Sequence, residues 1–227
     1  MAQSRLVVPA TFNRNAVDVQ TLGKPEQTGK LLMEYMAERL GLGSLADLDV
    51  LDFGCGCRFS ESIINLGVPI KSYFGIDVYK ELMDFLAQEV RDPRFEYRSV
   101  AYKNARYNKD GEVMGADTTL PCGDRTFDVI CMFSVITHQD PTEARATFRV
   151  LRHYVRPDGR LFFSAAIEEG ADYHEKDPAN PGALSIYSFK TMKTMLEAAG
   201  WEIVSHAPRN PRGLPILDSF LCKPVAA

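Results

Sequence analysis

Two glycines and two aspartates occupy positions from which they could together hold a nucleoside. Residues 49–53 form a short apolar stretch typical of a buried strand, with Asp52 in it and Gly54 and Gly56 directly after it. Glycine lets the backbone approach a ligand closely, and a helix that starts after the turn offers free N–H groups. Asp77 ends the next apolar stretch, where its carboxylate could accept two hydrogen bonds from a ribose diol. In open α/β sheets, ligands bind beyond the carboxyl ends of the strands, so we expect these residues to meet there.

The surroundings of the two glycines distinguish between kinds of nucleoside cofactor. A dinucleotide site needs a third glycine for close helix packing and for the pyrophosphate, and Phe59 stands at that position. Asp52 beside the turn would repel a pyrophosphate, whereas it suits a sulfonium or ammonium cation. The residues therefore favour a cofactor without phosphates, and a nicotinamide-dependent oxidoreductase is the alternative.

Candidates for acid–base chemistry follow the apolar stretch 127–133. His138 lies just beyond it and could accept a proton from a hydroxyl group, or it could contact adenosine or have a structural role alone. Asp140 is a rival base, but Pro141 and Glu143 after it favour a capping box at the start of a helix. We therefore predict His138 as the catalytic residue.

Other side chains with possible roles lie near the acceptor or the cofactor. Tyr173, His174 and Tyr187 follow the predicted strand 160–167, where they could bind a substrate or belong to an ordinary solvated loop. Cys55 and Cys57 could suggest a metal or redox pair, but a spacing of one residue inside a glycine turn favours packing of small side chains. No metal site is predicted.

The elements that must position these residues alternate between strand and helix, as expected of a parallel sheet covered on both faces. Residues 101–126 show no periodicity and are predicted to be a long loop, which in a compact domain is usually functional. The predicted helices are 28–40, one around 82–90, one from Pro141 and one after Ser188, and the predicted strands are 49–53, 72–76, 95–100, 127–133, 160–167, 201–205 and 216–222. We expect an N-terminal segment and helix in residues 1–45, before a cofactor-binding domain in residues 46–227.

Composition narrows the classes of partner. The 227 residues carry a formal net charge of -4, which argues against a sequence-independent nucleic-acid binder. The five cysteines are odd in number and include no Cys-x-x-Cys pair, so neither a disulfide framework nor a structural zinc site is expected. No apolar run approaches the ~20 residues of a membrane span, and the first ten residues do not read as a secretory signal. We expect a cytoplasmic protein with a small-molecule partner. Its oligomeric state does not follow from the sequence.

Several motifs together resemble the class I S-adenosylmethionine-dependent methyltransferases. They are VLDFGCG (50–56), YFGID (73–77), LPCGDRTFDVI (120–130) and LRHYVRPDGRLFFS (151–164). FSVITH (133–138) and YNKDG (107–111) resemble a subgroup that modifies sugars and other small molecules. The resemblance implies a three-layer, Rossmann-like, doubly wound sheet, mostly parallel with an antiparallel last strand.

The resemblance also implies the cofactor, S-adenosyl-L-methionine, and the residues that bind it. These are Asp52, Gly54, Cys55, Gly56, Asp77, Val78, Ala101, Tyr102, Phe133 and Ser134. The chain departs from the family pattern at Arg58, which replaces a third glycine, and at Val100–Tyr102, where Gly-Asp-Ala is usual. The favoured function is methyl transfer to a hydroxyl of a sugar or another metabolite. A non-catalytic cofactor-binding regulatory protein is a further alternative, besides the oxidoreductase.

Overall fold

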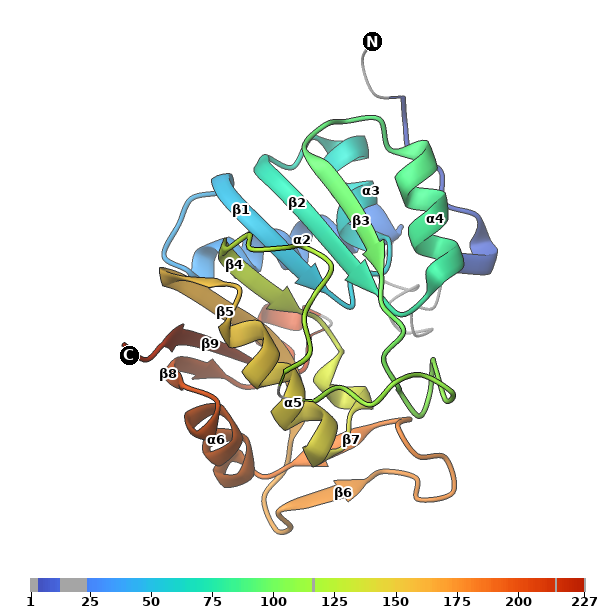
Figure 1. Cartoon of the computed structure of the whole chain (residues 1–227). Coiled ribbons are helices and arrows are strands. Elements are labelled where there is room, and N and C mark those ends of the chain that lie inside the picture. The colour runs from blue at the N-terminus through green and yellow to red at the C-terminus, as the bar shows by residue number, and fades with distance from the viewer. Residues whose placement is uncertain (1–3, 13–23, 116, 215, 227) are drawn as a thin grey trace.

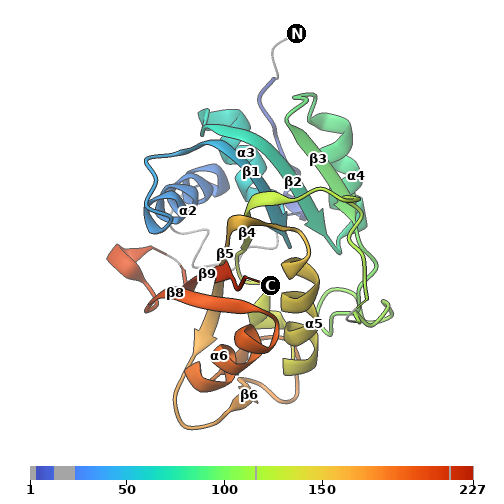
Figure 2. The ribbon, with the colours of Figure 1, turned by 60° about the vertical axis from the view of Figure 1, so that its left-hand side comes forward.

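A twisted central sheet carries helices on both faces (Figure 1, Figure 2). The structure, a computed structural model, describes residues 4–12, 24–115, 117–214 and 216–226. The described strands are β1 (Leu45–Phe53), β2 (Ile70–Asp77), β3 (Phe95–Ser99), β4 (Phe127–Met132), β5 (Val155–Ile167), β6 (Tyr173–Glu175), β7 (Ser185–Tyr187), β8 (Trp201–Ala207) and β9 (Asp218–Pro224). The described α-helices are α2 (Pro25–Arg39), α3 (Arg58–Leu66), α4 (Lys80–Glu89), α5 (Pro141–Arg152) and α6 (Phe189–Ala198).

The order of the strands brings the ends of β1, β2 and β4 together. β3, β2, β1, β4 and β5 run parallel in that order, and β9 joins β5 in the antiparallel direction with β8 beyond it. The expected Rossmann-like sheet with an antiparallel last strand is confirmed. Chain order reverses between β1 and β4, and in such folds ligands bind at this switch point, beyond the carboxyl ends of the strands.

Side chains along each strand point alternately to the two faces of the sheet, so the interior has two apolar layers. Leu51, Ile130 and Phe163 point toward α5 and α6, whose buried faces complete one layer. Val50 and Phe162 belong to the other layer, which α2, α3 and α4 cover. Because the parallel strands are buried on both faces, they are continuously apolar, as the sequence around 127–133 indicated.

The start of α5 has the geometry that its sequence predicts. The Asp140 carboxylate accepts hydrogen bonds from the backbone N–H groups of Thr142 and Glu143, while the Glu143 side chain accepts one from the backbone of Asp140. The capping box is confirmed, and it fixes the direction in which the chain leaves the end of β4.

The segment after β5 contains two strands that the sequence analysis did not predict. β6 and β7 form a short antiparallel hairpin, and β7 also pairs with the last residues of β5, Ala166 and Ile167. In Figure 1 this hairpin lies at the lower end of the molecule, beyond the carboxyl end of β5. Each strand spans only three residues, which is too short for a periodic pattern to show in the sequence.

Helix α2 corresponds to the helix predicted at residues 28–40. It packs on α3, and the hydroxyl of Tyr35 lies 3.0 Å from that of Ser219 on β9. Of the predicted N-terminal segment, residues 1–3 and 13–23 lie outside the described residues. The division of the chain after residue 45 stays a prediction.

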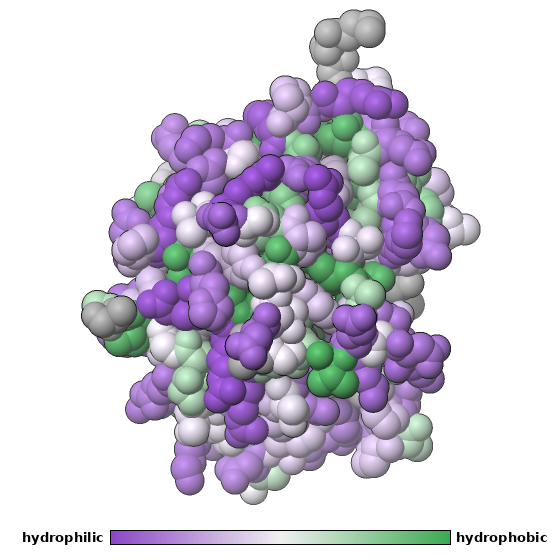
Figure 3. Space-filling model, in the orientation of Figure 1, coloured by the Kyte–Doolittle hydropathy of each residue, from purple (hydrophilic) through white to green (hydrophobic). Residues whose placement is uncertain are grey.

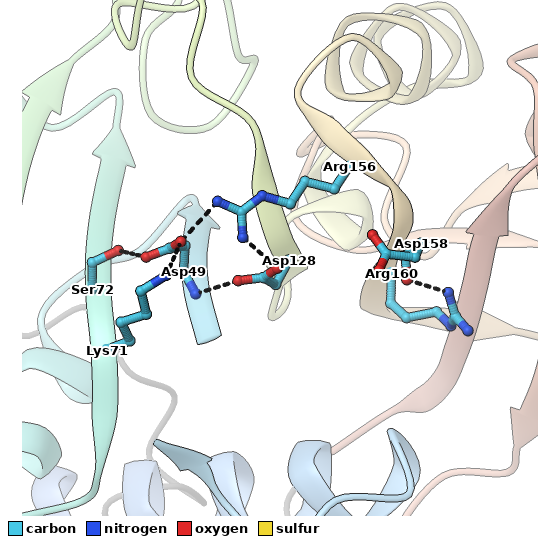
Figure 4. A network of polar contacts seen from close by, with 7 residues as sticks. All are labelled: Asp49, Lys71, Ser72, Asp128, Arg156, Asp158 and Arg160. Atoms are coloured by element: carbon cyan, nitrogen blue, oxygen red, sulfur yellow. Dashed lines mark hydrogen bonds and ion pairs between the residues drawn. The ribbon is translucent and has the colours of Figure 1, made fainter. Parts of the chain in front are cut away.

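A network of charges joins the strands at their amino ends (Figure 4). Arg156 on β5 donates to both Asp128 on β4 and Asp49 on β1, and Asp49 also accepts from Lys71 and Ser72 on β2. Partial burial raises the pKa of Asp49, but hydrogen bonds from Lys71, Ser72 and Arg156 outweigh it and lower this pKa to about 2. The network lies on the amino-end side of the sheet, whereas the predicted site lies at the carboxyl ends of β1, β2 and β4.

Polar side chains cover most of the face in Figure 3, and among the described residues the large exposed apolar side chains are Val7, Leu31, Leu42, Val113, Val204 and Val225. Among the described helices, none is long and apolar enough to cross a membrane.

Candidate functional site

One cavity lies at the carboxyl ends of the parallel strands. It encloses about 860 Å³, and its walls come from the glycine turn after β1, the end of β2, the segment after β4 and the 101–126 loop. Leu184 beside β7 and Ile216 before β9 complete it. A volume of this size is typical of small-molecule and cofactor sites.

The turn between β1 and α3 requires glycine for two different reasons. Gly54 and Gly56 have φ angles of +77° and +52°, in the left-handed region that L side chains rarely adopt. At Gly54 a Cβ atom would also come within 2.4 Å of Val135 Cγ2, whereas at Gly56 it would meet nothing within 4 Å. Gly54 therefore allows the segment after β4 to pack on the turn, and Gly56 leaves backbone open to the cavity that it lines.

Asp77 ties the end of β2 to this turn. One carboxylate oxygen accepts a hydrogen bond from the Gly56 backbone N–H at 2.9 Å, and the other accepts from Tyr79 N–H at 2.9 Å. Each oxygen has a second lone pair, so the carboxylate can still accept a donor from a ligand. The two backbone contacts fix the orientation of Asp77 at the wall of the cavity.

Asp52 is a buried carboxylate beneath the same turn. Its side chain accepts a hydrogen bond from the Tyr73 hydroxyl at 2.6 Å, and the residue is 3% exposed. Burial raises the pKa of Asp52 to about 7, although hydrogen bonds from Tyr73 and Cys131 act in the opposite direction. Such a carboxylate carries only part of its negative charge at neutral pH, and a cation bound beside it would favour the ionised form.

The cysteines of the turn line the cavity and also pack in an apolar layer of the core. Cys55 and Cys57 are both buried and unbridged, and Cys55 contacts Met83 in the apolar layer under α4. Burial raises the pKa of the Cys57 thiol to about 12 and that of Cys55 well above its ordinary value. Because the thiolate is the reactive form, neither side chain is suited to redox or nucleophilic chemistry.

His138 is held in one ring orientation on the cavity wall. Its Nδ1 lies 2.8 Å from the carbonyl oxygen of Gly182, and the Tyr107 ring meets the imidazole edge-on at 5.4 Å. A carbonyl only accepts hydrogen bonds, so Nδ1 carries the proton and Nε2 keeps its lone pair. Burial lowers the pKa of His138, although backbone hydrogen bonds with Gly182 and Ala183 act in the opposite direction, and so favours the neutral ring.

Most residues predicted for the cofactor line the same cavity. These are Asp52, Gly54, Cys55, Gly56, Asp77, Val78, Tyr102, Phe133 and Ser134. Ser134 has a φ of 60°, unusual for a residue other than glycine, and its backbone N–H donates to the Ser164 hydroxyl at 2.9 Å. Such strained positions are often found at binding sites. Ala101, by contrast, is exposed and is not among the lining residues.

The three residues predicted to bind a substrate are not among those that line the cavity. Tyr187 is fully buried, and its hydroxyl donates to the Gln139 carbonyl at 2.6 Å. Tyr173 donates to the Glu175 carboxylate next to it on β6, and His174, between them, is exposed. The hairpin, which the sequence did not indicate, directs the Tyr173 hydroxyl to Glu175 and the Tyr187 hydroxyl to Gln139 and leaves His174 exposed.

The sequence reasoning missed much of the far wall of the cavity. Asn104, Arg106, Thr137, Gln139 and Thr147 all line it, as does Tyr107. The Asn104 amide donates to the His138 carbonyl at 2.7 Å, which joins the 101–126 loop to the segment after β4. The sequence offered the length of the loop and the motifs YNKDG (107–111) and FSVITH (133–138) as signals, and none of them assigned a role to these side chains.

Comparison with known proteins agrees with this geometry. The family described as methyltransferase domain matches residues 16–206. Among solved structures, the glycopeptide N-methyltransferase MtfA is 16% identical with a TM-score of 0.57, and the match covers 88% of this chain and 90% of that one.

Two further structures are similar over most of their length. The 1,6-didemethyltoxoflavin-N1-methyltransferase of Burkholderia thailandensis, with S-adenosylhomocysteine bound, is 18% identical with a TM-score of 0.58 over 92% of this chain and 82% of that one. The magnesium protoporphyrin IX methyltransferase of Synechocystis, with its methyl donor bound, is 18% identical with a TM-score of 0.56 over 93% and 86%. At these identities the likeness concerns the fold.

Proposed function

The chain belongs to the methyltransferase-domain family as a class I S-adenosylmethionine-dependent enzyme, and on this basis we propose that it methylates a hydroxyl group of a small molecule such as a sugar. The donor is S-adenosyl-L-methionine. The observation that carries the choice of a hydroxyl is the neutral, oriented imidazole of His138 on the cavity wall.

The residues of the glycine turn fit the donor. Gly56 leaves open space where a side chain would stand, and Asp77 keeps lone pairs for the ribose diol. Asp52 is a carboxylate beneath the turn, where it favours a nearby positive charge. Phe133, Ser134, Val78 and Tyr102 supply further wall for the nucleoside.

S-adenosylmethionine supplies an electrophilic methyl group on a sulfonium, with a neutral thioether as leaving group. The cavity has to hold the acceptor oxygen in line with that methyl carbon, and such positioning supplies a large part of the rate acceleration, up to ~7–11 kcal/mol in favourable systems. Nε2 of His138 takes the proton that the hydroxyl loses on attack. The Gly182 carbonyl holds Nδ1–H during this transfer and so stabilises the imidazolium.

The nature of the acceptor atom separates this proposal from its nearest alternative. An amine can attack in its neutral form without a base, and two of the structurally similar proteins are by name N-methyltransferases. A hydroxyl needs a base within reach, which is the role that we assign to His138. Loss of the base therefore affects the two kinds of acceptor differently.

The test is a labelled-methyl screen. The protein is incubated with methyl-labelled S-adenosylmethionine and the small-molecule fraction of an extract from its source organism, and mass spectrometry identifies the metabolites that gain a methyl group. We expect an O-methylated product, and His138→Ala should lower its rate by about 100-fold. Affinity for S-adenosylhomocysteine, measured by calorimetry, should stay nearly unchanged in this variant.

Three other outcomes would each replace the proposal. An N-methylated product whose rate does not depend on His138 would favour an amine acceptor. Tight binding of S-adenosylhomocysteine with no labelled product in any fraction would favour a non-catalytic, cofactor-binding role. Binding of a nicotinamide dinucleotide in place of S-adenosylhomocysteine would support the oxidoreductase alternative.

A further inference from the structure

The segment of residues 4–12, which lies before α2, ends at the wall of the cavity. Its last residues form the short 3₁₀ helix Ala10–Phe12, and Phe12 lines the cavity. In Figure 1 this segment, drawn in blue, lies next to α4. The match to the methyltransferase-domain family begins at residue 16, so Phe12 adds to the cavity a side chain from outside the matched residues.

Side chains of α2 and α3 hold the start of this segment in place. The side-chain amide of Asn65 on α3 accepts from the backbone N–H of Leu6 at 2.8 Å and donates to the Leu6 carbonyl at 2.9 Å. Arg5 donates to both carboxylate oxygens of Glu26 on α2 at 2.7 Å, and Asn65 donates to the same carboxylate. Leu6 is 3% exposed and belongs to the apolar layer that α2, α3 and α4 cover. The segment is therefore fastened to the domain by polar and apolar contacts together.

The Phe12 ring lies beside the end of β2, where Asp77 is. It meets the Tyr79 ring edge-on with the ring centroids 5.6 Å apart, and the Phe85 ring on α4 lies at 5.3 Å. Tyr79 also lines the cavity, and its backbone N–H donates to the Asp77 carboxylate at 2.9 Å. Phe12 is only half-buried by these contacts. A nucleoside whose ribose is bound to Asp77 would thus have an apolar ring within reach that still has surface to cover.

We propose that Phe12 belongs to the donor site and packs on the adenosine portion of S-adenosylmethionine, and that Asn65 positions it through its bonds to Leu6. Contact between an aromatic ring and a nucleoside removes apolar surface of both from water. The loss of one aromatic ring that packs on a base usually lowers affinity severalfold or more. The inference concerns the donor alone, so it does not depend on the choice of a hydroxyl as methyl acceptor.

Phe95 on β3 offers a matched control for the removal of a phenyl ring. Like Phe12 it is half-buried and packs against the apolar layer under α2, α3 and α4. It also contacts two aromatic rings, those of Tyr73 at 5.5 Å and Tyr97 at 6.1 Å, but it is not among the residues that line the cavity. Phe12→Ala and Phe95→Ala should therefore both lower the melting temperature, and only the first should weaken binding of the donor.

The experiment compares wild type, Phe12→Ala, Phe95→Ala, Asn65→Leu and the double variant Phe12→Ala with Asn65→Leu. Calorimetry measures the Kd of S-adenosylhomocysteine and of adenosine for each protein. We expect Phe12→Ala to raise both Kd values by at least about fivefold and by a similar factor, because the two ligands share the adenosine portion. Asn65→Leu should raise both Kd values by a smaller factor and add little to Phe12→Ala in the double variant, since it acts through Phe12. Phe95→Ala should bind both ligands like wild type.

Four other outcomes would each refute part or all of the inference. Unchanged affinities in Phe12→Ala would overturn it and leave the proposed methyl transfer standing, as would an equal loss in Phe95→Ala, which would show a general effect of packing. A loss for S-adenosylhomocysteine without a loss for adenosine would refute the assignment of Phe12 to the adenosine portion. Full additivity in the double variant would overturn the positioning role of Asn65. A wild type that binds neither ligand would overturn the inference together with the donor itself.

Discussion

Asp77 is the residue whose removal should most directly weaken cofactor binding. Asp77→Asn removes the charge and replaces one accepting oxygen with an NH₂ group. Whichever way the amide turns, this NH₂ faces one of two backbone donors, Gly56 N–H or Tyr79 N–H, that now lie 2.9 Å from the carboxylate. We expect a loss of about 2 kcal/mol, or about 30-fold in the Kd of S-adenosylhomocysteine, measured by calorimetry.

A pair of nucleosides tests whether the lost affinity comes from the contact between Asp77 and the ribose. The wild type should bind adenosine more tightly than 2′,3′-dideoxyadenosine, which lacks the diol, and Asp77→Asn should lose most of this preference. Asp92→Asn is the control, because Asp92 also accepts a backbone N–H, from Arg94 at 3.0 Å, but lies before β3 at the opposite edge of the sheet. If Asp77→Asn distinguishes the two nucleosides as strongly as wild type does, the assignment of Asp77 to the ribose is wrong.

Three further predictions follow from the fold. Asp49→Asn should lower the free energy of unfolding by about 1 kcal/mol at neutral pH, since this carboxylate lies near the surface. Because the pKa of Asp49 is lowered on folding, the difference should disappear as the pH falls from about 4 through about 2 in denaturant titrations. Asp140→Ala removes the capping box and should cost about 1 kcal/mol in the same assay. Gly54→Ala should lower both the melting temperature and S-adenosylhomocysteine affinity, because its Cβ would come within 2.4 Å of Val135 Cγ2; Gly213→Ala, with a φ of +76° and open space, is the control for φ alone.

Sequence periodicity predicted those parts of the fold that depend on local pattern. The start of α5 at Pro141 follows from side chains that bond to their own helix, so no distant contact was needed to place it. The parallel strands were recognisable because burial on both faces makes them continuously apolar. Asp52, Gly54, Gly56 and Asp77 were brought together correctly because one topological rule places the ends of neighbouring strands.

The part of the cavity that the 101–126 loop and the segment after β4 line could not be predicted in the same way. Thr137 and Gln139 line it because a 3₁₀ helix turns the chain after β4, and a helix of three residues is too short to show a periodic pattern in the sequence. Tyr187 was a candidate for the substrate because it follows the predicted strand 160–167, where a loop could enclose an acceptor. Pairing of β7 with β5 instead buries it, and its hydroxyl holds the Gln139 carbonyl.

The charge network at the amino ends of the strands has a consequence for redesign. Hydrogen bonds and ion pairs of Arg156 and Asp49 link β1, β2, β4 and β5 near their amino ends, on the side of the sheet away from the cavity. Neither residue is among those that line the cavity. The register of the scaffold thus has an anchor that is independent of the 101–126 loop and the hairpin of β6 and β7. Changes at exposed positions of those two segments would leave the anchor intact, whereas Leu120, Cys122 and Tyr187 of the same segments belong to the buried core and have to be kept.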